Sequence, residues 1–220
     1  MSETKLVLAS TSPRRNALLR LLGISFEKRP SHADETHPED VDAVGYVRQM
    51  AREKGRAVLH ADGEWILSAD TIVVLDGQVV GKPADEEDAY EILRALRARG
   101  HKVYTALCLR TENGGGTLES LCETDVFMRD YTEEELAAYI ASEDYKDKAG
   151  GYAIQHRQFH PCTGVVGCYA NVMGLPLCHL AMLLMSAGYK LDADVPQACQ
   201  RYNDIRCEVY PQIYRRENPG

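Results

Sequence analysis

The sequence lacks any uninterrupted apolar run long enough for a membrane-spanning helix. Its first residues, MSETKLVLAS, lack the basic segment and longer apolar segment of a secretory signal, so we expect a cytoplasmic protein. The CxxC spacing that is common in zinc sites is also absent, and the seven cysteines are scattered and odd in number. We therefore expect free thiols in a reducing compartment rather than a framework of disulfides.

An excess of basic residues is missing as well. The chain has 25 Lys and Arg against 33 Asp and Glu, a formal net charge of -8. This balance argues against nucleic acid as a partner, although a local basic cluster can still bind phosphates. Internal repeats and low-complexity runs are lacking too. With 220 residues and a hydrophobic fraction of 45%, we expect one sizeable domain over residues 1–188 and a polar C-terminal extension of unknown role over residues 189–220.

What is present is an alternation of strand and helix signals. Ser12 followed by Pro13 predicts a helix start, and Thr132 with Glu135 predicts a capping box. The expected strands are residues 5–10, 65–75, and two more on either side of the glycine-rich turn at 113–116. The expected helices are residues 13–22, 39–59, one from 85 that stops at Gly100, 133–142, and one from about 176.

The segment SADTIVVLDGQVVGKP is an apolar hairpin that carries two charges. Its Asp76-Gly77 turn predicts that Leu75 pairs with Gln78, which places Asp70 about one rung from Lys82. A structural ion pair and a functional site both explain this pattern. Burying a charge pair costs desolvation, so stability alone is a weak reason for it.

Three other places add to the site hypothesis. Arg14 and Arg15 occupy the first turn of a helix that follows a strand, where backbone N–H groups bind anions. Lys54 interrupts the apolar stripe of the 39–59 helix, and DET at 34–36 carries two adjacent acids. Solvated surface charge, or a lysine whose stem covers apolar surface, explains each of them singly. Together they supply cations for a polyphosphate and acids for a divalent metal, although the GxxxxGK[ST] motif is absent.

Seven motifs in order resemble the Maf family of nucleoside triphosphate pyrophosphatases: LASTSPRRNALLRLLGISF, DET, REK, SADTIVVLDGQVVGKPADEEDA, YTALCL, DKAGGYAIQ and NVMGLPL. The resemblance covers about residues 5–187. It implies an α/β fold with a central mixed, twisted sheet and helices around a cleft, similar to the inosine triphosphate pyrophosphatases. A homodimer is suggested by the resemblance alone.

The resemblance also implies a reaction and its residues. Water would attack the α-phosphorus of a nucleoside triphosphate and release pyrophosphate and the monophosphate. Asp70 would be the catalytic carboxylate, which takes a proton from the water or binds a divalent metal, Mg²⁺ or Mn²⁺, together with Glu35. The residues implied to bind the triphosphate are Ser10, Arg14, Arg15, Lys54 and Lys82.

The branch of the family that acts on dTTP and UTP is the one that this chain resembles, on the evidence of Arg14, Thr71 and Gln155. A Gln amide offers the acceptor and donor that complement the N3–H and O4 of uracil or thymine. The segment HRQFHPCTGVVGCY, directly after Gln155, departs from the family pattern, so 7-methyl-GTP, CTP or a modified nucleotide remain alternatives. A weakly catalytic nucleotide-binding regulator of cell division is the alternative of another class.

That departing segment also raises the question of a zinc site. It contains two histidines and two cysteines, but Pro161 interrupts the helix that would place both histidines on one face. We therefore favour free thiols. The four residues concerned are His156, His160, Cys162 and Cys168.

Overall fold

The computed structural model describes residues 4–31, 33, 42–111 and 116–214 of the chain. Within those residues, seven strands form one sheet in the order β2-β1-β3-β5-β6-β7, and β4 pairs with β3 beside that path. The strands are β1 (Lys5–Leu8), β2 (Phe26–Lys28), β3 (Glu64–Leu75), β4 (Gln78–Val80), β5 (Gly100–Arg110), β6 (Thr117–Met128) and β7 (Cys162–Gly167). β1 runs parallel to β2 and β3, whereas the other pairings are antiparallel. The expected mixed sheet is confirmed.

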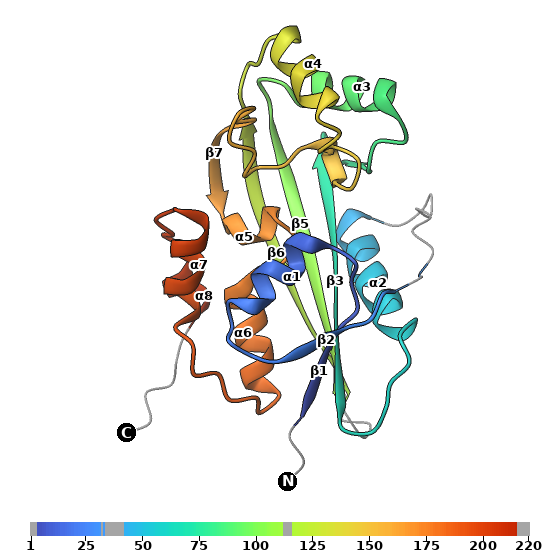
Figure 1. Ribbon diagram of the computed structural model, residues 1–220, viewed down its shortest axis with the longest axis vertical. Coiled ribbons are helices and arrows are strands. Elements are labelled where there is room, and N and C mark those ends of the chain that lie inside the picture. Colours follow the sequence, from blue (N-terminus) through green and yellow to red (C-terminus); the bar gives the residue numbers. More distant parts are fainter. Residues whose placement is uncertain (1–3, 32, 34–41, 112–115, 215–220) are drawn as a thin grey trace.

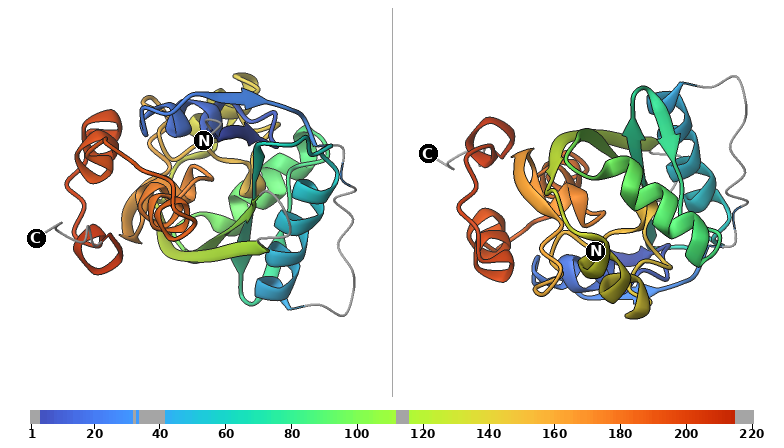
Figure 2. Two further views of the ribbon diagram at one scale, coloured as in Figure 1. Left: turned by 90° about the horizontal axis from the view of Figure 1, so that it is seen from below. Right: turned by 90° about the horizontal axis from the view of Figure 1, so that it is seen from above.

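Helices cover both faces of this sheet (Figure 1, Figure 2). They are α1 (Pro13–Arg20), α2 (Ala43–Arg56), α3 (Glu86–Leu96), α4 (Glu133–Ala141), the short 3-10 turn η1 (Ala149–Gly151), α5 (Tyr169–Val172), α6 (Leu177–Ser186), α7 (Val195–Asn203) and α8 (Tyr210–Ile213). α2 packs on one face of β3 and β5, while α1 and α6 pack on the other. α3 and α4 lie together at one end of the long strands and enclose a core of their own (Figure 1).

Local capping explains where the predicted helices begin. The side chain of Ser12 accepts a hydrogen bond from the backbone N–H of Arg15, and Thr132 and Glu135 form the predicted capping box. The helix expected from residue 39 begins at Ala43 among the described residues, because Asp42 caps it through the N–H of Gly45. The expected stop of the third helix at Gly100 is wrong, since that helix ends at Leu96 and Gly100 opens β5.

The predicted hairpin register is confirmed. Leu75 pairs with Gln78, and the turn residues Asp76 and Gly77 both have positive φ, at 52° and 81°. Such a turn twists with the strands that it joins, and Asp and Gly adopt it at little cost. The described ladder of β3 and β4 ends at the Val73–Val80 pair, so Asp70 lies beyond it.

The sequence did not predict β2, η1, β7, α5, α7 or α8. Of these, β7 lies within the departing segment, and α5 begins at its last residue, Tyr169. β7 adds a strand beside β6, and the single-turn α5 follows it at Tyr169–Val172. The extension continues into α7 and α8, whose contacts with α6 place Leu191, Val195 and Cys199 in the same core as α1. The division of the chain at residue 188 stays a prediction.

The cysteines match the expectation of free thiols. All seven are unbonded, and five of them are buried. Burial raises the pKa of the Cys178 and Cys199 thiols to about 12. No helix in the described ranges is both long and apolar enough to cross a membrane.

Candidate active site

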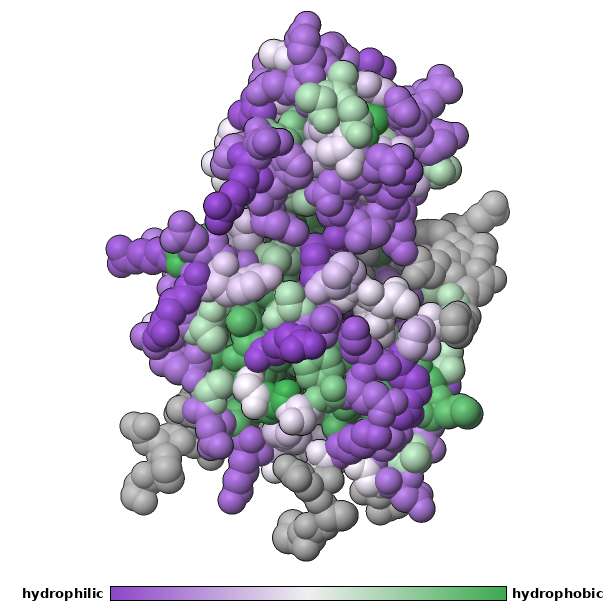
Figure 3. Space-filling view, viewed as in Figure 1, coloured by the Kyte–Doolittle hydropathy of each residue, from purple (hydrophilic) through white to green (hydrophobic). Residues whose placement is uncertain are grey.

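A cavity lies in a notch beside β3. β1 pairs with β3 along Glu64–Leu67, and β4 pairs with it only from Val73 onward. Between these two ladders the edge of β3 borders a cavity of about 260 Å³, which the segment after β1 and the segment after β4 also line. Figure 3 shows the recess as a hydrophilic band between the part with α3 and α4 and the part with α1. The carboxyl end of a parallel strand is the usual place for a ligand in an open α/β sheet.

Asp70 points from β3 toward the face that α2 covers. Its Oδ1 accepts a hydrogen bond of 2.6 Å from the Nζ of Lys54, and the two side chains are only 10% and 12% exposed. α2 comes this close because Gly55 has no side chain: a Cβ there would lie 2.7 Å from the Oγ of Ser68. The lysine that interrupts the apolar stripe of α2 is therefore placed directly on the predicted catalytic carboxylate.

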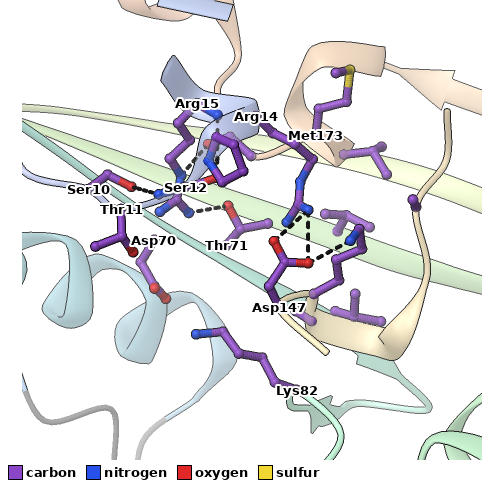
Figure 4. Close-up of a pocket in the computed structure, with 18 of the residues that line it drawn as sticks. Ser10, Thr11, Ser12, Arg14, Arg15, Asp70, Thr71, Lys82, Asp147 and Met173 are labelled. Atoms are coloured by element: carbon purple, nitrogen blue, oxygen red, sulfur yellow. Dashed lines mark hydrogen bonds and ion pairs between the residues drawn. The ribbon is translucent and has the colours of Figure 1, made fainter. Parts of the chain in front are cut away.

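Thr71, the next residue, points to the opposite side of β3, as alternation in a strand requires. Its Oγ1 accepts a hydrogen bond of 2.9 Å from the Nη2 of Arg15, whose Nε donates to the carbonyl of Gly174 at 2.9 Å. Thr71 also bonds to the hydroxyl of Thr105, which donates to the carbonyl of Asn171. Arg15 is thus fixed between two segments of the cavity wall (Figure 4).

Two more of the predicted phosphate-binding residues line the cavity: Ser10, just before α1, and Lys82, just after β4. The Oγ of Ser10 accepts a hydrogen bond of 3.1 Å from the N–H of Ser12 and lines the cavity beside the first helical turn. Lys82 enters from the segment after β4, and its ammonium end points toward the carboxylate of Asp70 (Figure 4). Asp70 and Lys82 therefore line the same cavity, although the cross-strand pairing that suggested their proximity stops earlier.

The sequence reasoning missed Asp147 and Lys148 as individual site residues. The Nη1 of Arg14 donates to both carboxylate oxygens of Asp147, at 3.0 and 3.2 Å, and Lys148 donates to the same carboxylate at 2.5 Å. Partial burial alone would raise the pKa of Asp147, but the hydrogen bond from Lys148 and the charge of Arg14 hold it below its ordinary value. In the sequence both residues open the motif DKAGGYAIQ, but a motif does not reveal the partners of its side chains.

Gln155 lies at the same end of the cavity as Arg14. The adjacent Tyr152 is buried, and its hydroxyl bonds to the Nε2 of His101 at 2.7 Å. Burial lowers the pKa of His101 to about 4, so this histidine is neutral at physiological pH. The part of the cavity wall that Tyr152 forms is therefore uncharged.

The predicted metal ligand Glu35 lies outside the described residues. Among the residues that are described, no group of three or more His, Cys, Asp or Glu side chains could hold a metal ion, and this includes the histidines and cysteines after Gln155. Asp70 is a carboxylate inside the cavity, and Mg²⁺ is commonly bound by one or two carboxylates together with substrate phosphates. The donor chemistry therefore fits a cation that is completed by a polyphosphate.

Gly174 offers a test of how tightly Arg15 must be held. Its φ is +100°, and a Cβ there would lie 3.3 Å from both the Nε of Arg15 and the Oγ1 of Thr71. Gly188 has a similar φ of +90° but nothing within 4 Å of its Cβ position. We expect Gly174→Ala and Gly188→Ala each to lose about 1–2 kcal/mol of unfolding free energy through backbone strain. Only Gly174→Ala should also lower nucleotide turnover, about tenfold, because Arg15 is displaced.

Denaturant unfolding and steady-state kinetics on both variants check this. Equal turnover in the two would show that the position of Arg15 is not critical.

Comparisons with known proteins find similar sequences over most of the chain. A family model described as Maf-like protein matches residues 5–187. A dTTP/UTP pyrophosphatase of Anaeromyxobacter sp. (strain Fw109-5) is 45% identical over 196 residues, which are 87% of this chain and 94% of that protein. A dTTP/UTP pyrophosphatase of Thermomicrobium roseum is 40% identical over 223 residues, which cover 96% of this chain and 99% of that protein. A solved HAM1 protein from Coxiella burnetii is 17% identical, with a TM-score of 0.40 and coverage of 58% of this chain and 74% of that chain.

Proposed function

This chain belongs to the Maf family, and we propose that it hydrolyses nucleoside triphosphates, dTTP and UTP above all, to the monophosphate and pyrophosphate. The observation that carries the proposal is the buried contact of Asp70 with Lys54 inside a cavity that Arg15 and Lys82 also line. A carboxylate among several cations is the arrangement that hydrolysis of a phosphoanhydride needs. The choice of substrate is supported by the relatives, which are dTTP/UTP pyrophosphatases.

In the proposed reaction the cations bind the triphosphate and Asp70 acts on water. Arg15, Lys54 and Lys82 approach the cavity from three different elements, so they can surround the phosphate chain. Asp70 orients the attacking water and accepts its proton while the bond from the α-phosphorus to the leaving pyrophosphate breaks. The charge that develops on the phosphate oxygens and on the leaving group is met by the same cations, which are already in place.

We propose that the reaction requires Mg²⁺ or Mn²⁺. Asp70 would contribute an oxygen ligand, with Glu35 as the second carboxylate implied by the family resemblance. A divalent cation bound there would neutralise phosphate charge and polarise the bond that is attacked.

We propose that Arg14, Thr71 and Gln155 select the base. Gln155 and Arg14 line the same end of the cavity, and Thr71 holds Arg15 between the base end and the phosphate end. The amide of Gln155 can accept from N3–H and donate to O4 of a pyrimidine. A base that does not match would leave these groups unpaired, which is a strong source of discrimination.

A panel of substrates tests the proposed function. We expect purified protein with Mg²⁺ or Mn²⁺ to release pyrophosphate from dTTP and UTP at least about tenfold faster than from purine triphosphates, since unpaired buried polar groups discriminate strongly. Pyrophosphate and orthophosphate are measured separately, with CTP and 7-methyl-GTP included. Orthophosphate as the first product would contradict attack at the α-phosphorus. Turnover of another nucleotide would keep the reaction and overturn the assignment of the base pocket.

A further inference from the structure

The carboxylate of Asp147 sits where the base end of the cavity continues into a second recess. Both that recess and the cavity beside β3 are lined by Arg14, Asp147, Lys148 and Gln155. The recess is also lined by Glu143, Asp144 and Lys146, of which Lys146 pairs with Glu143. Arg14 is 19% exposed and contacts both oxygens of Asp147, whose side chain is 51% exposed. A negative and a positive group therefore stand together beside the amide proposed to read the base.

The need to pair the charge of Lys148 does not by itself explain why Asp147 lies beside Arg14. The Lys148 side chain is 7% exposed and already has a carboxylate partner in Asp144, with Nζ 2.9 Å from Oδ1, and it also donates to the carbonyl of Asp144. Asp144 bonds to Lys148, whereas Asp147 bonds to both Arg14 and Lys148. Asp147 is thus the carboxylate of this pair that faces Arg14.

We propose that Arg14 and Asp147 set base selection as a charge-balanced pair, in which Arg14 cancels the attraction of Asp147 for a cationic base. With the pair intact, the base end carries little net charge beside Gln155 and accepts a neutral pyrimidine. Asp147 is then a positioning residue that acts through Arg14. This inference rests on the proposed function, because it takes the Gln155 end of the cavity as the site of the base.

GTP and 7-methyl-GTP are suitable probes, because they differ by one methyl group and the positive charge that it creates. The quantity measured is the ratio of the dissociation constant of GTP to that of 7-methyl-GTP, by calorimetry. We expect Arg14→Gln to raise this ratio about fivefold, because it exposes the charge of Asp147 in a partly solvated place. Asp147→Asn alone should lower the ratio by a similar factor, because Arg14 then repels the cation.

Double variants separate charge balance from a structural role. Arg14→Gln with Asp147→Asn should return the ratio to that of the unaltered protein, whereas Arg14→Gln with Asp144→Asn should leave it raised. Asp144→Asn is the matched control because it removes the other carboxylate partner of Lys148. Thermal unfolding of each variant confirms that it is folded.

The proposal is overturned if the ratio stays constant in both single variants or if both double variants behave alike. Hydrolysis of dTTP by the unaltered protein is measured in parallel. Normal hydrolysis with an unmoved ratio would overturn this inference and keep the proposed function. If the unaltered protein does not hydrolyse dTTP but the ratios change as expected, the proposed function is overturned and the role of the Arg14–Asp147 pair in base binding is kept. Failure of either purine nucleotide to bind the unaltered protein would overturn the inference, since the base end would then hold no purine.

Discussion

Asp70→Asn is expected to lower kcat for dTTP by about 10³-fold, which is within the range for loss of a general base. The amide cannot accept the proton of the attacking water, while its size and its place on β3 are unchanged. Binding of dTTP should persist within about threefold, because the variant removes a negative charge that faces the phosphates. Release of pyrophosphate gives kcat, and calorimetry gives the dissociation constant.

Asp76→Asn is the matched control for this variant. It makes the same chemical change in the same hairpin, but at an exposed turn where the carboxylate contacts Arg99. Asn is well suited to the positive φ of that position, so activity should be unchanged. Undiminished hydrolysis by Asp70→Asn would remove Asp70 from its assigned role. An unaltered protein that binds nucleotides and releases no product would favour the regulator of cell division instead.

Lys54→Met is expected to lower kcat/KM for dTTP by about 10²-fold, since a preorganised cation is lost beside the reacting phosphate. Methionine has a similar length and an apolar stem, so the change chiefly removes charge. The buried carboxylate of Asp70 also loses the 2.6 Å hydrogen bond from Lys54, and we expect a cost of about 1–3 kcal/mol in unfolding free energy. Steady-state kinetics and denaturant unfolding measure the two effects.

Arg56→Met supplies the control, because it removes a cation from the same last turn of α2 at an exposed position. Both variants change the net charge equally, so a general effect of charge on nucleotide attraction would appear in both. A loss in Lys54→Met that Arg56→Met matches would assign the effect to long-range attraction. A kcat/KM within threefold of the unaltered value would show that Lys54 serves packing.

Features that depend only on residues close together in the chain could be predicted from the sequence. The caps at Ser12 and Thr132 and the Asp76-Gly77 turn formed as predicted, because each rests on hydrogen bonds or backbone angles within four residues. Gly100 misled the prediction because a glycine after a helix can equally open a strand. β7 and α5 were not predicted, because the sequence from Pro161 to Cys168 shows little alternation of apolar and polar residues and forms a strand only by pairing with β6.

The sequence by itself determined the chemical inventory of the cavity: the carboxylate of Asp70 on β3, and cations after β1, on α2 and after β4. It also determined the hairpin register, because a two-residue turn leaves a single pairing. Only the tertiary structure decided which charges meet. Lys54 reaches Asp70 because Gly55 lets α2 approach β3, and Arg14 reaches Asp147 across 133 positions of the chain. Such contacts depend on how closely two faces pack, and no local pattern records that distance.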